Sequence, residues 1–315
     1  MNLLGKKVLL TGANGFVGSA TTKALLRSKF EVLQAVRKST NLDEISIGVI
    51  DGGTDWTKAL IDCSVVIHCA ARVHMMQDSV SDPFSEYQKV NVAGTLNLAR
   101  QAARAGVKRF VFLSSIKVNG EETQLGGPYS AHDVAAPEDA YGISKAEAEA
   151  GLRLLSLETG MEVVIIRPPL VYGPGVKGNF SSLLRWVARG LPLPLGLATT
   201  NRRSLVGLDN LVDLILTCVD HPKAANQTLL VSDGEDLSTA DLLRRIGKAL
   251  NRPARLIPVP VSILIIASRL LGKSSIAQRL LGSLQVDISE TCILLNWKPP
   301  VSVDEGLRRA AQQRS

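Results

Sequence analysis

Short, almost wholly apolar segments alternate with amphipathic segments through the first half of the chain. The apolar segments are "KKVLLT", "EVLQAVR", "SVVIHCAA", "KRFVFLSS" and "EVVIIRPP", at residues 6–11, 31–37, 64–71, 108–115 and 162–169. The segments between them have helical spacing and include residues 19–28, residues 90–105 and a stretch that starts near Tyr141. Buried strands separated by helices predict an α/β fold, a doubly wound parallel sheet covered on both faces. Ligands of such sheets bind at the carboxyl ends of the strands.

The amino-acid composition of the chain changes after residue 172. Prolines and glycines become frequent, as in "RPPLVYGPG" and "GLPLPLG". We therefore expect residues 1–172 to form a Rossmann domain and residues 173–315 to form a smaller C-terminal substrate-binding domain. Within residues 205–233, "DNLVDLILTCVDH" and "QTLLVSD" indicate one more helix and strand that return to the sheet.

The longest apolar run lies late in the chain, at residues 256–272, "LIPVPVSILIIASRLLG". Pro258, Pro260 and Arg269 interrupt it, so it is too short for a membrane-spanning helix. A helix that is buried or faces a protein partner is expected here, in preference to a helix on a membrane surface.

The net charge of +7 at pH 7 permits an anionic ligand. Nucleic acid is not expected as a partner, because the sequence has no basic run and no basic patch interleaved with aromatics. Four histidines do not cluster, and the cysteines lack metal-ligand spacing, so no metal site is predicted. Scattered cysteines, and a start that passes directly into a strand, predict a cytoplasmic protein with reduced thiols. These cysteines are Cys63, Cys69, Cys218 and Cys292.

A glycine-rich loop, "TGANGFVG", lies between the first predicted strand and the first helix. Gly12, Gly15 and Gly18 recur at intervals of three residues. One glycine would suffice for a tight turn, whereas three indicate a ligand that closely approaches the backbone. The N–H groups of a helix N-terminus suit a phosphate. The loop predicts a dinucleotide site of the βαβ type, and a purely structural turn is the alternative.

Three side chains form a candidate catalytic set near that edge of the sheet. "FVFLSSIKVNG" ends a strand at Ser114 and Ser115, and in "DAYGISKAEAE" Tyr141 and Lys145 lie four residues apart, on one helix face. A nearby ammonium favours a phenolate, and lowering a tyrosine pKa by about 3 units takes about 4 kcal/mol. Ser115 can donate a hydrogen bond to the same reacting oxygen. Each feature alone is common in helices and strand ends, but their combination with the glycine loop favours catalysis.

The motifs "TGANGFVG", "HCAA", "VNVAGT", "SSIKVNG", "YGISK" and "RPPLVYGPG" resemble the extended short-chain dehydrogenase/reductase family, the NAD-dependent epimerases and dehydratases of nucleotide sugars. The resemblance implies a catalytic triad of Ser115, Tyr141 and Lys145, and a mainly structural role for Asn91. The candidate cofactor-binding residues are Gly12, Asn14, Gly15, Phe16, Val17, Gly18, Arg37, Asp51, Cys69, Ala70, Ala71, Tyr141, Lys145 and Pro168. The candidate substrate-binding residues are Ser115, Lys117, Asn179 and Arg203.

Two departures from the family pattern concern the cofactor. Arg37 and Lys38 stand at the end of the second strand, where an acidic residue commonly binds the adenosine ribose. An arginine there would attract a 2′-phosphate, so NADP(H) is favoured over NAD(H), and an arginine stacked on adenine is the alternative. Asp51 lies two positions later than the usual adenine-side aspartate.

Three positions bear on the substrate. Ile116 and Lys117 replace the Asp–Glu pair of related sugar dehydratases, which disfavours dehydration. Leu170 replaces an asparagine of many 4-epimerases, and Arg203, next to Arg202, aligns with an arginine that binds the nucleotide diphosphate.

The stretches "HCAARVHMM", "SSIKVNGEET" and "NRRSLVGLDN" resemble enzymes of O-antigen gene clusters. We therefore expect reduction of the C4 keto group of a UDP-2-acetamido-2,6-dideoxy-hexos-4-ulose to UDP-N-acetylquinovosamine. A UDP-hexose 4-epimerase is the alternative of the same class, and a non-catalytic NAD(P)-sensing regulator is the alternative of another class. The resemblance also implies a homodimer through residues 90–105 and 141–157, where Ala146, Ala148 and Ala150 leave room for helix packing.

Overall fold

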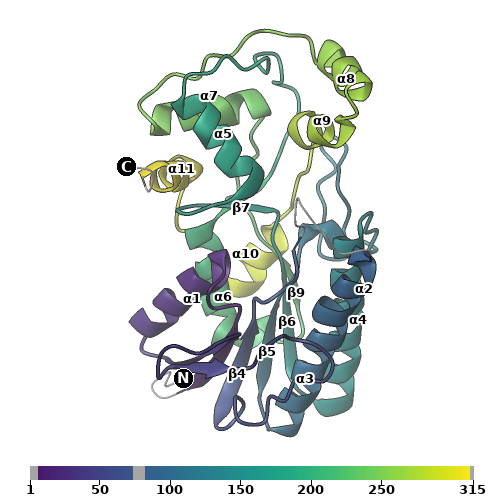
Figure 1. The fold of residues 1–315 in the computed structure, drawn as a ribbon, viewed down its shortest axis with the longest axis vertical. Helices are drawn as coiled ribbons and strands as arrows, with labels where there is room; N and C mark the ends of the chain where they lie inside the picture. The colour runs from purple at the N-terminus through teal and green to yellow at the C-terminus, as the bar shows by residue number, and fades with distance from the viewer. Residues whose placement is uncertain (1–5, 74–81, 313–315) are drawn as a thin grey trace.

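The computed structural model describes residues 6–73 and 82–312, so residues 74–76 of the "HCAARVHMM" motif lie outside the described ranges. Its largest element is a seven-stranded parallel sheet with the order β3-β2-β1-β4-β5-β6-β9 (Figure 1). The strands are β1 (Lys7–Thr11), β2 (Glu31–Val36), β3 (Glu44–Ser46), β4 (Cys63–His68), β5 (Arg109–Leu113), β6 (Glu162–Arg167) and β9 (Thr228–Leu230). The predicted doubly wound α/β fold is confirmed.

Helices cover both faces of this sheet, which explains why its strands are apolar throughout. Val8 and Leu10 point into a core shared with α1 (Phe16–Arg27), α6 (Leu208–Asp220) and α10 (Ser289–Leu295). Leu9, between them, points into the opposite core, shared with α3 (Thr95–Arg104) and α4 (Ala140–Thr159). Because successive strand residues alternate between two buried faces, neither set of positions is polar.

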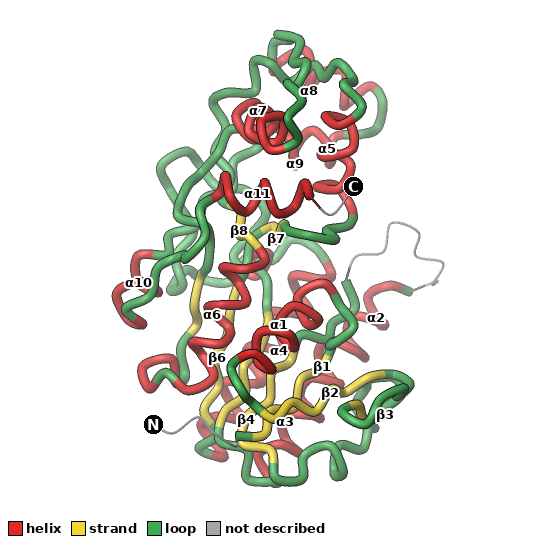
Figure 2. Tube along the Cα trace, turned by 90° about the vertical axis from the view of Figure 1, so that its left-hand side faces the viewer, coloured by secondary structure: helices red, strands yellow, loops and turns green. Residues whose placement is uncertain are grey.

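A second group of elements, which we call the helical lobe, lies beyond the carboxyl ends of the sheet strands (Figures 1 and 2). It contains the two-stranded pair β7 (Leu170–Tyr172) and β8 (Leu205–Gly207), and the helices α5 (Gly178–Ala188), α7 (Thr239–Ala249), α8 (Val261–Leu270), α9 (Ser274–Leu281) and α11 (Val303–Gln312). Its own core includes Phe180, Leu184, Leu243 and Leu307. Since β6 runs directly into β7, the carboxyl edge of the sheet faces this lobe.

The chain crosses between the sheet and the helical lobe more than once. Helix α6 and strand β9 return to the sheet, and β9 pairs with β6. Further along, Leu295 and Trp297 pack in the same core, and Trp297 Nε1 donates a 2.7 Å hydrogen bond to Asp213 of α6. The two lobes are therefore interleaved along the sequence.

Small residues on α4 serve packing inside one subunit. Ala148 is fully buried against the core that α3 shares, and a Cβ at Gly151 would lie 2.7 Å from the Leu96 side chain. Ala148 is therefore not available to a second subunit, contrary to the expectation that it lines a dimer contact. Leu154 and Leu157 of the same helix are 61% and 85% exposed, and the homodimer stays a prediction.

The apolar run at residues 256–272 forms α8, which has no buried residue. The expectation that this helix is buried is wrong, because α8 packs mainly on α9 at the far end of the helical lobe (Figure 1). That it faces a protein partner is untested. Within the described residues, none of the helices is both long and apolar enough to cross a membrane.

Candidate active site

Two of the three glycines in the loop after β1 are required by close packing of the backbone. Gly12 has a φ of +72°, and a Cβ there would lie 2.7 Å from the Ala70 nitrogen that follows β4. A Cβ at Gly18 would lie only 2.0 Å from the Gly12 carbonyl oxygen. Any side chain at Gly18 would therefore push the first turn of α1 off the loop.

The start of α1 fits the phosphates of a dinucleotide. Gly15 is the N-cap residue and makes no side-chain capping bond, while Asn14 and Gly15 are exposed. The first amide groups of a helix, here those of Phe16, Val17 and Gly18, have no partner inside the helix and carry a partial positive charge. An anionic group can approach them because glycine leaves the backbone uncovered.

The other residues predicted to contact a cofactor follow neighbouring strands. Cys69, Ala70 and Ala71 come directly after β4, and the Ala70 N–H donates a 3.2 Å hydrogen bond to Thr11 Oγ1 at the end of β1. Pro168 follows β6, and its carbonyl accepts a 3.0 Å bond from the Ile116 N–H. These residues thus lie on one edge of the sheet.

Arg37 and Asp51 occupy the loops on the other side of the glycine turn. Arg37 is exposed directly after β2, as an adenine-side residue would be. Asp51 Oδ1 accepts a 2.9 Å bond from the Gly53 N–H, and Lys89 Nζ lies 4.0 Å from the carboxylate. The Asp51 carboxylate therefore stabilises the turn at residues 51–53.

The sequence could not tell the two serines at the end of β5 apart, and the structure gives them different surroundings. Ser114 is buried and its hydroxyl donates a 2.5 Å bond to Glu149 Oε1. Ser115 is half-buried and caps the short 3-10 helix η2 (Ile116–Val118), since its Oγ accepts a 3.2 Å bond from the Lys117 N–H. Ser115 keeps a hydroxyl proton that can be donated to a ligand.

Tyr141 and Lys145 lie on the first turns of α4, which begins at the N-cap Asp139. Lys145 is buried, donates a 2.8 Å bond to the Leu113 carbonyl, and lies 4.4 Å from the centre of the Phe112 ring. Its ammonium is 6.0 Å from the centre of the Tyr141 ring. The helix therefore brings the cation and the phenol together at the carboxyl end of β5.

The protonation behaviour of this pair is dominated by burial. Burial lowers the pKa of Lys145 to about 8, against the attraction of Glu149. The pKa of Tyr141 is raised by burial, by Asp139 and by Tyr87, whose ring packs edge-on at 6.1 Å. The sequence predicted a lowered pKa for Tyr141, whereas in this structure the shift has the opposite direction. A phenolate at Tyr141 therefore needs further stabilisation from bound groups.

A buried ion pair lies next to the elements that carry Ser115 and Lys145, and it was not found from the sequence. Glu149 of α4 is fully buried and accepts two hydrogen bonds from Arg167, at 2.9 and 2.6 Å. Arg167 also donates a 2.8 Å bond to Asn119, just after η2. The pair connects α4, β6 and the segment after β5, because Ser114 binds the same carboxylate.

His68 and Asn91 hold the neighbouring segments in place. His68 lies between Thr11 and Thr95, with 2.7 and 2.9 Å hydrogen bonds, and burial together with the Lys145 charge lowers its pKa to about 3. Asn91 sits in a π-helix, η1 (Gln88–Gly94), and donates 3.0 Å bonds to the Arg72 carbonyl and to Ser144. Asn91 therefore ties the segment after β4 to α4, which is a structural role.

The predicted substrate-binding residues have unequal surroundings. The Lys117 ammonium pairs with Asp139 at 2.5 Å and Glu121 at 2.6 Å; these bonds outweigh burial and raise its pKa. Asn179 is exposed in the first turn of α5. Arg203 is half-buried, and its backbone pairs with Leu237 and with Leu284 in isolated β-bridges. Burial lowers the pKa of its guanidinium. Lys117 is thus occupied in organising the start of α4.

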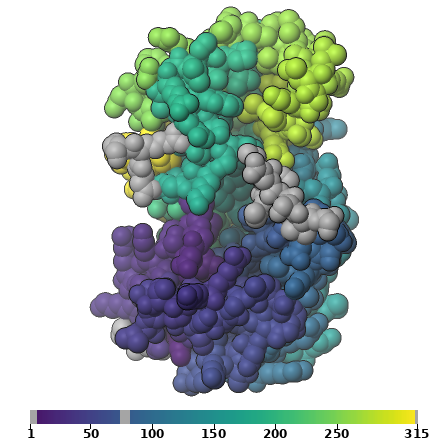
Figure 3. All heavy atoms as spheres, in the orientation of Figure 1, coloured from purple at the N-terminus to yellow at the C-terminus, as the bar shows by residue number. Residues whose placement is uncertain are grey.

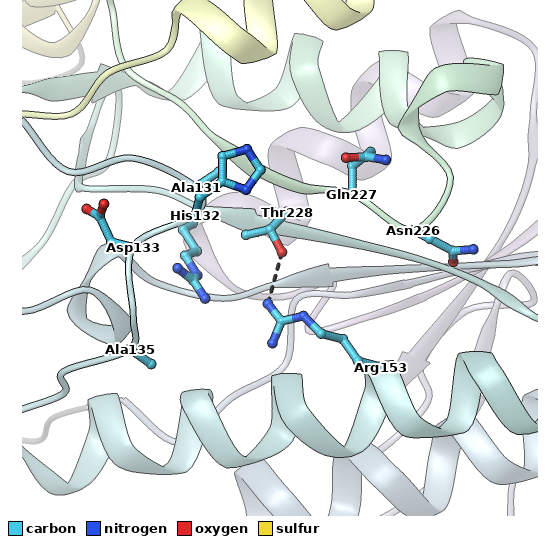
Figure 4. A pocket seen from close by; sticks show the side chains of 9 residues that line it. Ala131, His132, Asp133, Ala135, Arg153, Asn226, Gln227 and Thr228 are labelled. Carbon is cyan, nitrogen blue, oxygen red and sulfur yellow. Dashed lines mark hydrogen bonds between the residues drawn. The ribbon is translucent and has the colours of Figure 1, made fainter.

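A surface cavity of about 360 Å³ lies away from these residues, beside the middle of α4 and the start of β9 (Figure 4). Arg153 extends across it and donates a 2.9 Å bond to Thr228. The same guanidinium binds Glu149, and the Arg167 guanidinium also lines the cavity. The cavity thus lies next to the buried ion pair, whose Arg167 and Glu149 side chains are themselves only 4% and 1% exposed. Within the described residues, His, Cys, Asp and Glu side chains form no group that could hold a metal ion.

Residues 8–231 match the family described as the NAD dependent epimerase/dehydratase family. Over 98% of the chain, it is 53% identical to a UDP-glucose 4-epimerase of Vibrio cholerae, of which it covers 95%. It is also 29% identical to an Escherichia coli O157:H7 protein named N-acetyl-alpha-D-glucosaminyl-diphospho-ditrans,octacis-undecaprenol 4-epimerase, with coverage of 98% and 95%. The UDP-glucuronic acid 4-epimerase of Bacillus cereus in complex with NAD superposes with a TM-score of 0.78 at 23% identity, covering 98% of both chains.

The expectation of a UDP-sugar 4-ketoreductase is wrong. The 53% identical relative, which spans almost the whole chain, is named a 4-epimerase, and this favours the alternative of the same class. The family match covers the glycine loop, the serine at the end of β5 and the tyrosine–lysine pair of α4. The chain belongs to the NAD dependent epimerase/dehydratase family.

Proposed function

We propose that this protein is a 4-epimerase of UDP-sugars, with UDP-glucose and UDP-galactose as the first pair to test. The observation that carries the proposal is the 53% identity to the Vibrio cholerae UDP-glucose 4-epimerase over 98% of the chain. The buried lysine beside a tyrosine at the carboxyl edge of the sheet supports it, because inverting C4 requires the removal and return of one proton.

Within this proposal, Tyr141 takes the proton of the C4 hydroxyl and returns it to the C4 oxygen after the sugar has turned over. Ser115 donates a hydrogen bond to that oxygen, and the Lys145 cation stabilises the phenolate of Tyr141. These two interactions act against the burial that raises the pKa of Tyr141, and bound groups supply the remaining stabilisation of the phenolate. When bound, the nicotinamide would accept the C4 hydride and give it back.

We propose NAD(H) as this cofactor, held by the amides at the start of α1 and by the segment after β4. The Bacillus cereus 4-epimerase structure contains NAD, and the family is named for it. The preference for NADP(H) predicted from Arg37 and Lys38 is not supported by the NAD-bound 4-epimerase structure. An exposed arginine after β2 is equally suited to stack on adenine, which is the role that we now assign to Arg37.

The absence of the expected asparagine at Leu170 does not weigh against epimerisation. Leu170 begins β7, is 40% exposed, and carries no group that takes part in proton transfer. The proton transfer depends on other residues, and a diphosphate can be held by arginines such as Arg203. The O-antigen setting stays a prediction.

The test is incubation of the purified protein with UDP-glucose and, separately, UDP-galactose, without added cofactor. We expect both reactions to reach the same mixture of the two sugars. The same assay with UDP-N-acetylglucosamine and with a lipid-diphosphate-linked N-acetylglucosamine identifies the sugar and the carrier. Failure to interconvert any of these pairs, with or without added NAD, would refute the proposal.

Tyr141→Phe removes the phenol proton and keeps the ring. We expect turnover to fall about 10²- to 10⁴-fold, the usual contribution of a general acid–base group, with the fold retained. Tyr129→Phe is the matched control, since the Tyr129 hydroxyl donates to the Glu122 carbonyl and has no part in the proposed chemistry. Activity of Tyr141→Phe within twofold of wild type would remove Tyr141 from the mechanism.

A further inference from the structure

Helices α8 and α9 form an apolar cap at the far end of the helical lobe (Figure 3, upper right). Neither helix has a buried residue. The outward apolar side chains, here called the cap face, are between 50% and 83% exposed; they are Ile263, Ile266, Leu270, Leu271 and Ile276. Soluble monomers rarely gather so many large aliphatic side chains on one exposed surface, so this cap face indicates an interaction site.

The cap is attached to the lobe through its inner side only. Leu264 of α8, with Leu280 and Leu281 of α9, packs against the core of the helical lobe. The two helices are joined by the turn at Gly272, which has a φ of +63°. Within the described residues, the inner side chains of α8 and α9 hold the cap on the lobe, and the cap face points away from this contact.

The segments that carry the cap are rich in basic residues, and the Glu122 carboxylate lies against Gly282, which follows α9. Residues 173–208 and 242–286, which include α5, α8 and α9, contain thirteen Lys and Arg and no Asp or Glu. The rest of the chain contains the remaining 23 basic residues against all 29 acidic ones. The whole net charge of +7 therefore originates in these two segments, while the rest of the chain is acidic.

We propose that the cap face docks on a membrane surface that contains anionic lipid. Aliphatic side chains flanked by Arg269, Lys273 and Arg279 match an apolar interior beneath anionic headgroups. A second copy packed on the cap face would bring the basic residues of the two caps together, which like-charge repulsion opposes. The cap face also lacks the tyrosine and tryptophan that anchor protein interfaces. The proposal does not depend on the epimerase activity.

The test is flotation of the full-length protein with phosphatidylcholine vesicles and with vesicles containing phosphatidylglycerol. We expect binding to the anionic vesicles, release by high salt, and little binding to the neutral ones. Leu270→Glu with Leu271→Glu should weaken binding at least about a hundredfold, since two leucines leave the lipid. Arg269→Gln with Lys273→Gln should weaken it by about 25-fold, at about fivefold for each charge.

Leu42→Glu with Val134→Glu is the matched control, because both side chains are at least 88% exposed but lie on the sheet side of the molecule. This variant should bind vesicles as the wild type does. Thermal melts report whether each variant is folded, so the result does not rely on activity. Absence of vesicle binding, equal binding to both lipids, or binding that survives the cap changes would overturn the proposal. So would wild-type self-association, seen by light scattering, that only the cap change abolishes.

Discussion

Replacement of Glu149 by glutamine tests whether the buried ion pair holds together the elements that carry Ser115, Tyr141 and Lys145. The side chains of Glu149 and Arg167 are 1% and 4% exposed, and Arg167 donates two hydrogen bonds to the carboxylate. Glutamine keeps the shape and loses the charge. The Arg167 guanidinium would then be buried without a counter-charge beside the segment that carries Ser114.

Breaking a buried pair by removing one partner costs about 3–5 kcal/mol, because the remaining charge is uncompensated. An unfolding entropy of about 2.1 cal/mol/K per residue gives about 0.66 kcal/mol/K for 315 residues. Glu149→Gln should therefore lower Tm by about 5–8 °C. Arg153 binds the same carboxylate, but it is 46% exposed, so Arg153→Gln should cost less than about 1 kcal/mol.

The assay is urea unfolding of the wild type, both single variants, and a double variant with leucine at 149 and 167. Two leucines remove both charges, so the double variant should be more stable than Glu149→Gln. A loss below 1 kcal/mol for Glu149→Gln would show that this pair is not a major constraint. A double variant less stable than Glu149→Gln would refute the argument from the uncompensated charge.

Three further predictions follow from the site. Burial lowers the pKa of Lys145 from 10.5 to about 8 in the folded protein. Between these pH values the unfolded chain holds the proton and the folded protein does not, so the free energy of unfolding rises by about 3 kcal/mol as the pH rises from 8 to 10.5. Urea unfolding of Lys145→Met at both pH values should lack this gain. If the stability difference between the variant and the wild type is the same at both pH values, the lowered pKa of Lys145 is excluded. Gly18→Ala places a methyl group against the Gly12 carbonyl, and calorimetry should show loss of NAD binding. Gly127→Ala should keep it, because a Cβ there makes only an ordinary 3.7 Å contact with the Gln124 carbonyl oxygen. Arg37→Ala should weaken NADH and NADPH equally if the side chain stacks on adenine, whereas a selective loss for NADPH would restore the 2′-phosphate role.

The sheet and its carboxyl edge could be predicted because their signals are local. Each strand is a short apolar run, and both faces are buried, as for Val8, Leu9 and Leu10. The tyrosine and lysine are four residues apart on one helix. In contrast, Glu149 and Arg167 lie on a helix and a strand and look like ordinary charged residues in the sequence. Only the fold reveals that both are buried and paired.

The choice between reductase and epimerase could not be made from single substitutions. Leu170 and Arg37 were each given weight, yet one side chain in a loop or at a strand start changes few contacts. Both activities use the same proton transfer at C4. They differ in whether the sugar turns over before it is reduced again, and neither Leu170 nor Arg37 reports on that step.

A sugar ring can turn over within a site only if the protein binds another part of the molecule while the ring moves. On the proposed function, the diphosphate provides that handle, since phosphates bind strongly to arginine whatever the orientation of the ring. The helical lobe is suited to this task because it is basic and carries Arg202 and Arg203 between β7 and α6. The sheet side fixes Ser115, Tyr141 and Lys145 on buried, hydrogen-bonded elements. On the proposed function, the sheet edge holds Tyr141 in a fixed position while the helical lobe binds the diphosphate. The sugar ring could then turn and present either face of C4 to the same tyrosine.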